Sequence, residues 1–326
     1  MLTKERMSEL MEKHHVSQID MVFVNESKEM SVYRMGDDSL EDGMFAACSL
    51  SKFVTTILIL KLVENRKLSL DSPINDYFAS FSLNDQNGMR SQVTVRQLIQ
   101  HQGGLVDLPN QFGTTVQRSS FPSMEEILLG TTPYYELPVF VQSEEIGTFH
   151  YSDAGYCLLQ HAIEECMSST FEKIMSDFIF TPLDMKTSSY DLEIVEKFGV
   201  NGVEPDESIV SAYTCFYPYP AASGLWTTAS DLATLVNAIT TEGFLNTESR
   251  RTLFTTSSMN AEVGHGLFLN PNEPSKGFSF GWGIGFQSIL VMEKNSPTCL
   301  ICLSNRNEGI HQFEGMIGQV LRTHIT

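Results

Sequence analysis

Ser49 and Lys52 form an S-x-x-K pattern within the segment Ser49-Leu50-Ser51-Lys52. Three residues span about one helical turn, so the hydroxyl and the amine are expected on one face of a helix. There a lysine can accept the serine proton, provided that partial burial or a nearby cation depresses its pKa. The alternative is an ordinary helix start, with Ser49 as the cap and Lys52 in solvent. The apolar residues on both sides favour the nucleophile, because an ordinary cap needs no lysine on a buried face.

Tyr151 opens a second segment with reactive groups, Tyr151-Ser152-Asp153, at the expected start of another helix. If Tyr151 lies beside Lys52, the positive charge is expected to lower the pKa of its phenol. The tyrosine would then act as a base toward Ser49 or as an acid toward a leaving group. The alternative is again helix capping, by Ser152 or by Asp153.

Ser279 lies in a G-x-S-x-G pattern, Gly277-Phe278-Ser279-Phe280-Gly281, which presents the nucleophile in many hydrolases. That turn requires a strand before the serine and a helix behind it, whereas the residues after Ser279 are rich in glycine and typical of a strand. No aspartate follows Asp231, so the acid and the histidine that must follow Ser279 could only be Glu293, Glu308 or Glu314 and then His311 or His324, all close to the C-terminus. We therefore predict that Ser279 is not the nucleophile.

Hydrophobic periodicity indicates strands near both ends of the chain and helices in the middle. The expected strands are 19–25, 31–36, 265–270, 278–285, 287–293 and 298–304. The expected helices are 3–14, 50–64, 94–100, 124–129, 154–167, 171–178, a helix capped by Thr228 or Ser230, and 309–324.

This order predicts an α+β fold, with one antiparallel sheet built from both chain ends, flanked by helices, and a mostly helical inserted subdomain. We expect one catalytic domain, with an α/β region at about 1–75 and 220–326 and the helical insertion at about 76–219. Aromatic residues at 133–135 and 215–220 are candidate substrate walls, although packing between the two regions explains them equally well.

The composition narrows the class of partner. The formal net charge is −19, which disfavours nucleic acid and anionic membranes. No export signal and no apolar run of spanning length is visible, so we expect a cytoplasmic protein. Cys299 and Cys302 lie in what looks like a buried strand, and no second pair completes a zinc site, so we expect neither a metal nor a cofactor. The expected partner is a small-molecule or short-peptide substrate, and the oligomeric state stays open.

Four stretches in this order resemble the serine β-lactamase and penicillin-binding-protein superfamily, in the branch of class C β-lactamases, DD-peptidases and esterases. They are 47–78 with the S-x-x-K, 93–105 ending in HQGGL, 147–164 with Tyr151 at the Y-x-N position, and 220–239. The resemblance implies that Ser49 is acylated, that Lys52 activates it and that Tyr151 is the second proton-transfer group. It also implies an oxyanion hole from the backbone N–H of Ser49 and one N–H from a C-terminal strand.

Two positions depart from the pattern of that superfamily. Ser279-Phe280-Gly281 stands where relatives carry Lys-Thr-Gly or His-x-Gly, so a serine replaces a cation and Trp282 would supply the second oxyanion N–H. Asp153 stands where asparagine is usual. The cation lost at Ser279 would have attracted a substrate carboxylate, and the anion gained at Asp153 would repel it. Either effect can be large, because two unit charges ~4 Å apart interact by about 4 kcal/mol at an effective dielectric near 20. Asp153 can also pair with Lys52, which would raise the lysine pKa and leave more of the proton transfer to Tyr151.

These residues together predict a serine hydrolase that forms an acyl-enzyme at Ser49. Asp153, Ser279, Gly281 and Trp282 are the expected substrate-binding residues. The expected substrate is a neutral or amine-bearing ester or amide, as for an esterase or an aminopeptidase, rather than an anionic β-lactam or a DD-carboxypeptidase substrate. The alternative is a catalytically weak binding or acyl-transfer protein of the same fold.

Overall fold

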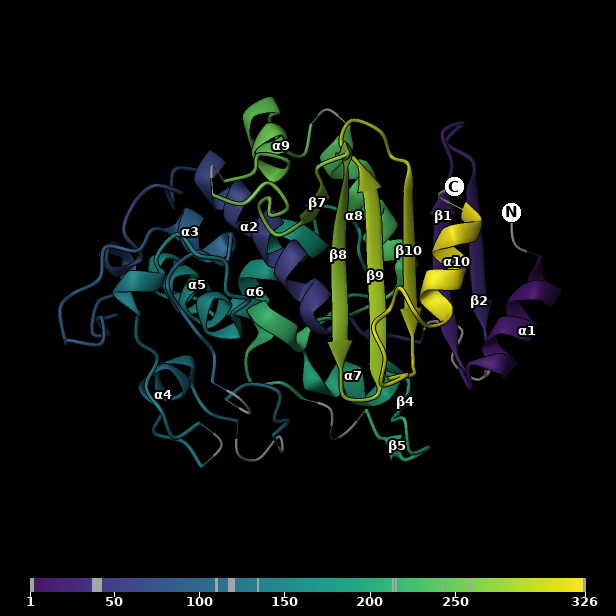
Figure 1. The fold of residues 1–326 in the computed structure, drawn as a ribbon, viewed down its shortest axis with the longest axis horizontal. Helices are drawn as coiled ribbons and strands as arrows, with labels where there is room; N and C mark the ends of the chain where they lie inside the picture. Colours follow the sequence, from purple (N-terminus) through teal and green to yellow (C-terminus); the bar gives the residue numbers. More distant parts are fainter. Residues whose placement is uncertain are drawn as a thin grey trace.

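Strands from both ends of the chain lie side by side in one antiparallel sheet in the computed structural model (Figure 1). The structure describes residues 3–36, 43–108, 111–116, 121–133, 135–212, 214, 216–241, 243–257 and 259–324. Its strand order is β2-β1-β10-β9-β8-β7, so the N-terminal hairpin pairs with the last strand of the chain. The predicted fold class is therefore confirmed. The strands are β1 (Ile19–Val24), β2 (Met30–Met35), β7 (Phe268–Asn270), β8 (Glu273–Gly283), β9 (Phe286–Glu293) and β10 (Cys299–Ser304).

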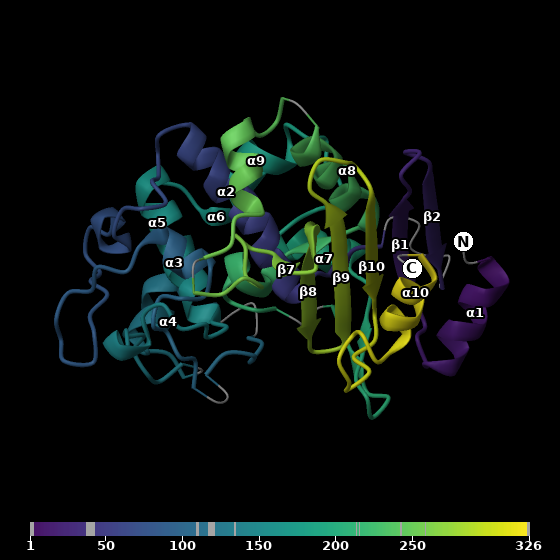
Figure 2. The same cartoon turned by 45° about the horizontal axis from the view of Figure 1, so that its top comes forward.

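Helices cover both faces of this sheet (Figures 1 and 2). On one face α1 (Lys4–Lys13) and α10 (Met316–His324) pack on β1, β9 and β10. On the other face α8 (Ala229–Thr240) packs on β1 and β10, within the larger core that also holds α2. Because β9 and β10 are buried on both faces, they are nearly continuous apolar runs. Cys299 and Cys302 belong to opposite cores, so they do not form a pair of neighbouring thiols.

α2 (Ser51–Glu64) is the most enclosed helix of the structure, since every residue of 51–60 is buried. It lies between the sheet and the helical part of the chain (Figure 1). The predicted apolar spacing of three and four residues is present, but the helix is apolar all round, as expected for a helix with no solvent face. No helix in the described part of the chain is long and apolar enough to cross a membrane.

The helices of the middle of the chain up to residue 167 lie on the far side of α2 from the sheet (Figure 1). Residues 192–210 form a helix and a short hairpin that lie instead at one end of the sheet, where the N–H of Val203 donates to the carbonyl groups of Gly285 and Asn305. Two-residue strands β3 and β6 pair next to the start of α2. The sequence analysis did not anticipate these short strands or α7 and α9. Its boundaries between an α/β region and an inserted helical region stay a prediction. These elements are α3 (Val95–Ile99), α4 (Met124–Leu129), α5 (Asp153–Met167), α6 (Phe171–Met175), α7 (Leu192–Phe198), α9 (Thr247–Leu253), β3 (Phe45–Ala46), β4 (Gly202–Val203), β5 (Ile209–Val210) and β6 (Trp226–Thr227).

Two glycines let β8 run directly against the turn that precedes α2. A Cβ atom on Gly281 would overlap the carbonyl oxygen of Ala47, and one on Gly283 would lie 2.7 Å from the Sγ atom of Cys48. Ser288, opposite Gly281 on β9, donates its hydroxyl to the same Ala47 carbonyl at 2.9 Å. The missing side chains therefore set how closely the C-terminal sheet approaches Ser49.

Gly281→Ala is expected to destabilise the protein, because the added methyl group must displace backbone atoms of Ala47. The expected loss in the free energy of unfolding is about 1–3 kcal/mol, the range for overpacked sites. Urea denaturation measures it. Gly155→Ala is the matched control, since its Cβ would meet its nearest neighbours at 3.6 Å, an ordinary contact. Equal stability of both variants would show that β8 can move away from the turn without cost.

Candidate active site

Ser49 lies in a single 3₁₀ turn, Cys48–Leu50, directly before α2. Cys48 has φ +51°, a left-handed conformation that non-glycine residues rarely adopt and that is often kept at functional sites. Ser49 does not cap α2, because the cap position is Leu50 and no side chain bonds to the free N–H groups there. The capping alternative for Ser49 is thus wrong, and its hydroxyl is available for chemistry.

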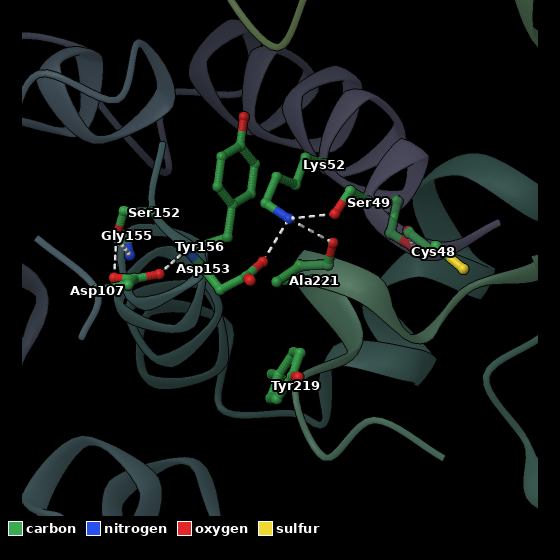
Figure 3. A network of polar contacts seen from close by, with 12 residues as sticks. Cys48, Ser49, Lys52, Asp107, Ser152, Asp153, Gly155, Tyr156, Tyr219 and Ala221 are labelled. Atoms are coloured by element: carbon green, nitrogen blue, oxygen red, sulfur yellow. Dashed lines mark hydrogen bonds and ion pairs between the residues drawn. The ribbon is translucent and has the colours of Figure 1, made fainter. Parts of the chain in front are cut away.

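Lys52 projects from the first turn of α2 with its ammonium group almost completely buried (Figure 3). Its Nζ donates to Ser49 Oγ at 3.1 Å, to Asp153 Oδ1 at 2.5 Å and to the Ala222 carbonyl at 2.9 Å. These three acceptors satisfy all three hydrogens of a protonated amine. The alternative of a solvated Lys52 is therefore wrong.

Asp153 forms the predicted ion pair with Lys52 across the interface of α2 and α5. Burial lowers the pKa of Lys52, but its interactions with Asp153 and, next in size, with Tyr151 together raise it above the ordinary value. Lys52 is therefore a stable ammonium ion in this structure, and it donates to Ser49 rather than accepting from it.

The ring of Tyr151 lies beside the same ammonium, with the Lys52 Nζ atom 4.9 Å from the ring centroid. Its other neighbour is His101, which stacks on it at 4.5 Å and accepts a hydrogen bond from the N–H of Ser152. Although 41% of Tyr151 is exposed, the surrounding protein raises its pKa, and Lys52 only partly offsets this effect. The predicted fall in the tyrosine pKa is therefore wrong, and Tyr151 is a neutral phenol. Burial, together with Lys52, lowers the pKa of His101 to about 3, so this ring is neutral too.

Ser279 and Gly281 lie in the C-terminal half of β8, and neither belongs to a nucleophile turn. Ser279 is 5% exposed and lines a narrow cleft together with Ser49, Lys52 and Tyr151. Trp282 is 44% exposed, and its indole N–H donates to Asn307 Oδ1 at 2.8 Å. The position of Ser279 inside a strand agrees with the prediction that it is not the nucleophile of a G-x-S-x-G turn.

A pocket of about 670 Å³ opens beside Ser49 and Tyr151. Its described lining contains one carboxylate, Glu262, and neither lysine nor arginine. The lining residues are Ser49, Tyr151, Glu262, Phe268, Leu269, Asn270, Pro271, Phe278, Phe280, Trp282, His311, Gln312 and Phe313.

Of the aromatic residues that the sequence suggested as substrate walls, those that the structure describes do not line this pocket. Tyr135, Tyr217 and Tyr219 are buried and pack on one another, while Tyr134 and Cys215 lie outside the described residues. The pocket walls come instead mainly from β7, β8 and the segment before α10.

A model of the Beta-lactamase family matches residues 9–324 of the chain. The chain belongs to the Beta-lactamase family. This membership confirms the superfamily inferred from the S-x-x-K and its companion stretches. It covers nearly the whole length described above, from α1 to the end of α10.

Relatives of this Beta-lactamase family member are distant in sequence but close in fold. The octameric penicillin-binding protein homologue of Pyrococcus abyssi has a TM-score of 0.76 at 21% identity, covering 98% of this chain and 76% of its own. The D-amino acid amidase of Ochrobactrum anthropi has a TM-score of 0.74 at 19% identity, covering 98% and 99%. Among curated proteins, "Beta-lactamase-like protein 2" of Dictyostelium discoideum is 24% identical over 50% of this chain and 29% of its own length. The chain thus spans less than a third of that relative.

Asp107 is a residue near the site that the sequence analysis missed, although it lies two positions after the HQGGL stretch. Its carboxylate accepts hydrogen bonds from Ser152 Oγ at 2.7 Å, from the N–H of Asp153 at 2.5 Å and from the N–H of Ala154 at 3.4 Å (Figure 3). Ser152 is the N-cap of α5, as one alternative of the sequence analysis expected, and its Oγ accepts from the N–H of Gly155 at 3.1 Å. Asp107 adds to this cap from outside the helix and holds Asp153 in place for Lys52. Burial and the charge of Asp153 raise the pKa of Asp107 to about 6.

Asp107→Asn is expected to alter how stability depends on pH. Because the folded-state pKa is raised, the contribution of Asp107 is full below about pH 4, the ordinary carboxyl range, and is lost as the pH rises through about 6. As the pH rises from about 4 to about 6, the free energy of unfolding of the variant should therefore increase by about 1–3 kcal/mol relative to that of the wild type. Urea denaturation at a series of pH values measures the difference.

Asp71→Asn provides the contrast for that series. The hydrogen bond and charge of Arg96 lower the pKa of Asp71, so its contribution is present above the ordinary pKa and lost in acid. As the pH falls into the acid range, the free energy of unfolding of Asp71→Asn should therefore approach that of the wild type, from a lower value at neutral pH. A constant difference between wild type and Asp107→Asn at all pH values would contradict the raised pKa of Asp107.

Proposed function

We propose that this protein is a serine hydrolase that cleaves neutral or amine-bearing esters or amides through an acyl-enzyme at Ser49. The observation that carries the proposal is the Ser49 hydroxyl itself, which receives a hydrogen bond from a buried ammonium at the mouth of a large pocket. Membership of the Beta-lactamase family supports the reaction class. The fold shared with a D-amino acid amidase is compatible with an amide substrate.

The charge states around Ser49 support a role for Tyr151 in the proton transfer. Lys52 is held protonated by Asp153, so it stabilises charge at the Ser49 oxygen instead of accepting its proton. A neutral Tyr151 can act as a relay, in which its oxygen takes the Ser49 proton while its own proton passes to the leaving group. The tyrosine is neutral before and after this step. In deacylation a water molecule attacks the ester, and the same relay returns a proton to Ser49.

We further propose that the backbone N–H groups of Ser49 and Trp282 form the oxyanion hole. The close approach of β8 to the turn at Ala47 and Cys48 supports this assignment, because it brings the two segments within contact distance. Pre-oriented N–H groups stabilise the oxyanion without reorganisation when charge develops. Gly281 then acts by its lack of a side chain rather than by a contact with substrate.

The substrate preference follows from the charges that surround the pocket. Ser279 supplies a hydroxyl where a cation would attract a carboxylate, and Glu262 adds a negative charge to the lining. Asp153 repels a substrate carboxylate less than the sequence suggested, because its ion pair with Lys52 neutralises its charge. A carboxylate on the substrate would therefore meet no free cation among the described lining residues, whereas a neutral group or an amine would be accepted.

A catalytically weak binding or acyl-transfer protein is the second candidate. The ion pair of Lys52 with Asp153 favours it, because a lysine held as an ammonium has lost its strength as a base. The two candidates differ in whether Ser49 reacts with acylating probes and whether water then releases the acyl group.

Ser49→Ala is expected to abolish labelling by a fluorophosphonate probe and to lower the kcat/KM of a neutral 4-nitrophenyl ester on the order of 10³-fold or more. Ser279→Ala should still be labelled, because its hydroxyl belongs to the wall of the site. Intact-mass spectrometry and ester hydrolysis measure the two effects. The wild type should also cleave the neutral ester faster than a cephalosporin. Labelling that survives Ser49→Ala would refute the assignment, and labelling without turnover would favour the second candidate.

Asp153→Asn is expected to lower the pKa of Lys52, because burial then acts without the opposing carboxylate. With Lys52 then able to act as a second base beside Tyr151, the kcat/KM for a neutral ester should rise several-fold near pH 8, and its pH profile should move to lower pH. Profiles from pH 5 to 10 test this. Asp177→Asn, which breaks the exposed pair with Lys173, is the matched control. Coinciding profiles of wild type and Asp153→Asn would show that Asp153 does not set the charge of Lys52.

A further inference from the structure

β8 has an unusual distribution of side-chain sizes between its two faces. Successive residues of a strand point to opposite sides, so Gly277, Ser279 and Gly281 share one face and Phe278, Phe280 and Trp282 share the other. The small residues are buried, whereas the aromatic ones are partly or largely exposed. This reverses the usual rule that the large apolar side chains of a strand face the core.

Further rings extend this aromatic face. The ring centroid of Phe280 lies 5.3 Å from that of Phe313, which it meets edge-on, and 5.9 Å from that of Phe268. The rings of Trp282 and His311 also meet edge-on, with their centroids 6.4 Å apart. We call the resulting surface the aromatic groove. Its members are Phe268, Phe278, Phe280, Trp282, His311 and Phe313.

The aromatic groove stays open because the helices on that side of the sheet stop short of it. The core formed by α1 and α10 reaches Phe278 and Phe280 only at its margin. Trp282 and Phe313 remain 44% and 43% exposed. Exposed aromatic surface of this extent is typical of a binding site. The groove is also continuous with the pocket that contains Ser49 and Tyr151, since all of its members line that pocket.

Hydrogen bonds hold the groove in this open form. The indole of Trp282 donates to Asn307, whose own amide donates to Glu204 Oε2 at 2.9 Å. Gln312 donates to the carbonyl of Gly281 at 2.7 Å, which ties the segment before α10 to β8. The rings are therefore positioned before any substrate arrives, as in most small-molecule sites.

We propose that the aromatic groove binds a large, uncharged apolar group of the substrate, either aromatic or a medium-length alkyl chain, while its ester or amide lies at Ser49. The inference rests on the proposed function and specifies its substrate class. The groove offers ring faces and edges along its length, and the one carboxylate of the described pocket lining, Glu262, disfavours an anionic tail. Short or charged acyl groups would leave the rings in water and gain little from them.

A chain-length series tests the proposal through catalysis. For 4-nitrophenyl acetate, butyrate, hexanoate and octanoate, kcat/KM should rise by about 3–4-fold for each CH₂ group that the groove buries. Phe280→Ala and Trp282→Ala should flatten this rise. Phe140→Ala removes an aromatic side chain of similar exposure outside the pocket and should leave the rise unchanged. An equal kcat/KM for all four esters in the wild type would overturn the proposal.

Binding to Ser49→Ala tests the groove without catalysis. The chain has 2 tryptophans, of which Trp226 is 3% exposed and Trp282 is 44% exposed. Octanamide should therefore shift the tryptophan emission of Ser49→Ala, acetamide should not, and the additional change Trp282→Phe should remove the shift. No shift with octanamide would overturn the groove. If Ser49 reacts with no ester but the shift is present, the proposed hydrolase is wrong while the apolar binding site stands.

Discussion

The buried ammonium group of Lys52 is the interaction on which the rest of the site depends. Its three acceptors come from the turn before α2, from the start of α5 and from the π-helical segment Pro220–Gly224. A buried charge without a partner costs several kcal/mol, so these segments must stay together around it. The same requirement explains the capping of α5 by Asp107, because a displaced Asp153 would leave Lys52 unpaired.

β8 imposes the second constraint, and its two faces serve different purposes. The small residues on its inner face allow the strand to approach Ser49 closely enough to line the site. The large residues on its outer face surround the pocket that continues from Ser49. A strand with the usual pattern of large buried residues would separate the sheet from α2, so the geometry of the site and the open aromatic surface follow from one sequence feature.

The charges at this site differ from those that the superfamily resemblance implied. Asp153 in place of asparagine raises the pKa of Lys52 and favours its charged form, and the raised pKa of Tyr151 favours a neutral phenol that can donate and accept. Ser49, Lys52 and Tyr151 lie together as expected, while the protonation states of Lys52 and Tyr151 differ from those that the resemblance implied. Under the proposed mechanism Lys52 stabilises negative charge at the Ser49 oxygen, and Tyr151 transfers the Ser49 proton.

The sequence by itself determined the sheet from both chain ends, the central helix and the meeting of Ser49 with Lys52, because hydrophobic periodicity and one-turn spacing are local properties. The resemblance to a known superfamily extended this to Tyr151 and Asp153, which lie far from Ser49 along the chain. Only the tertiary structure decided the pKa direction of Tyr151, the capping by Asp107 and the true walls of the pocket. These properties depend on burial and on contacts between distant segments. The wall-forming rings come from β7, β8 and the approach to α10, which meet at Ser49 only after the sheet has formed.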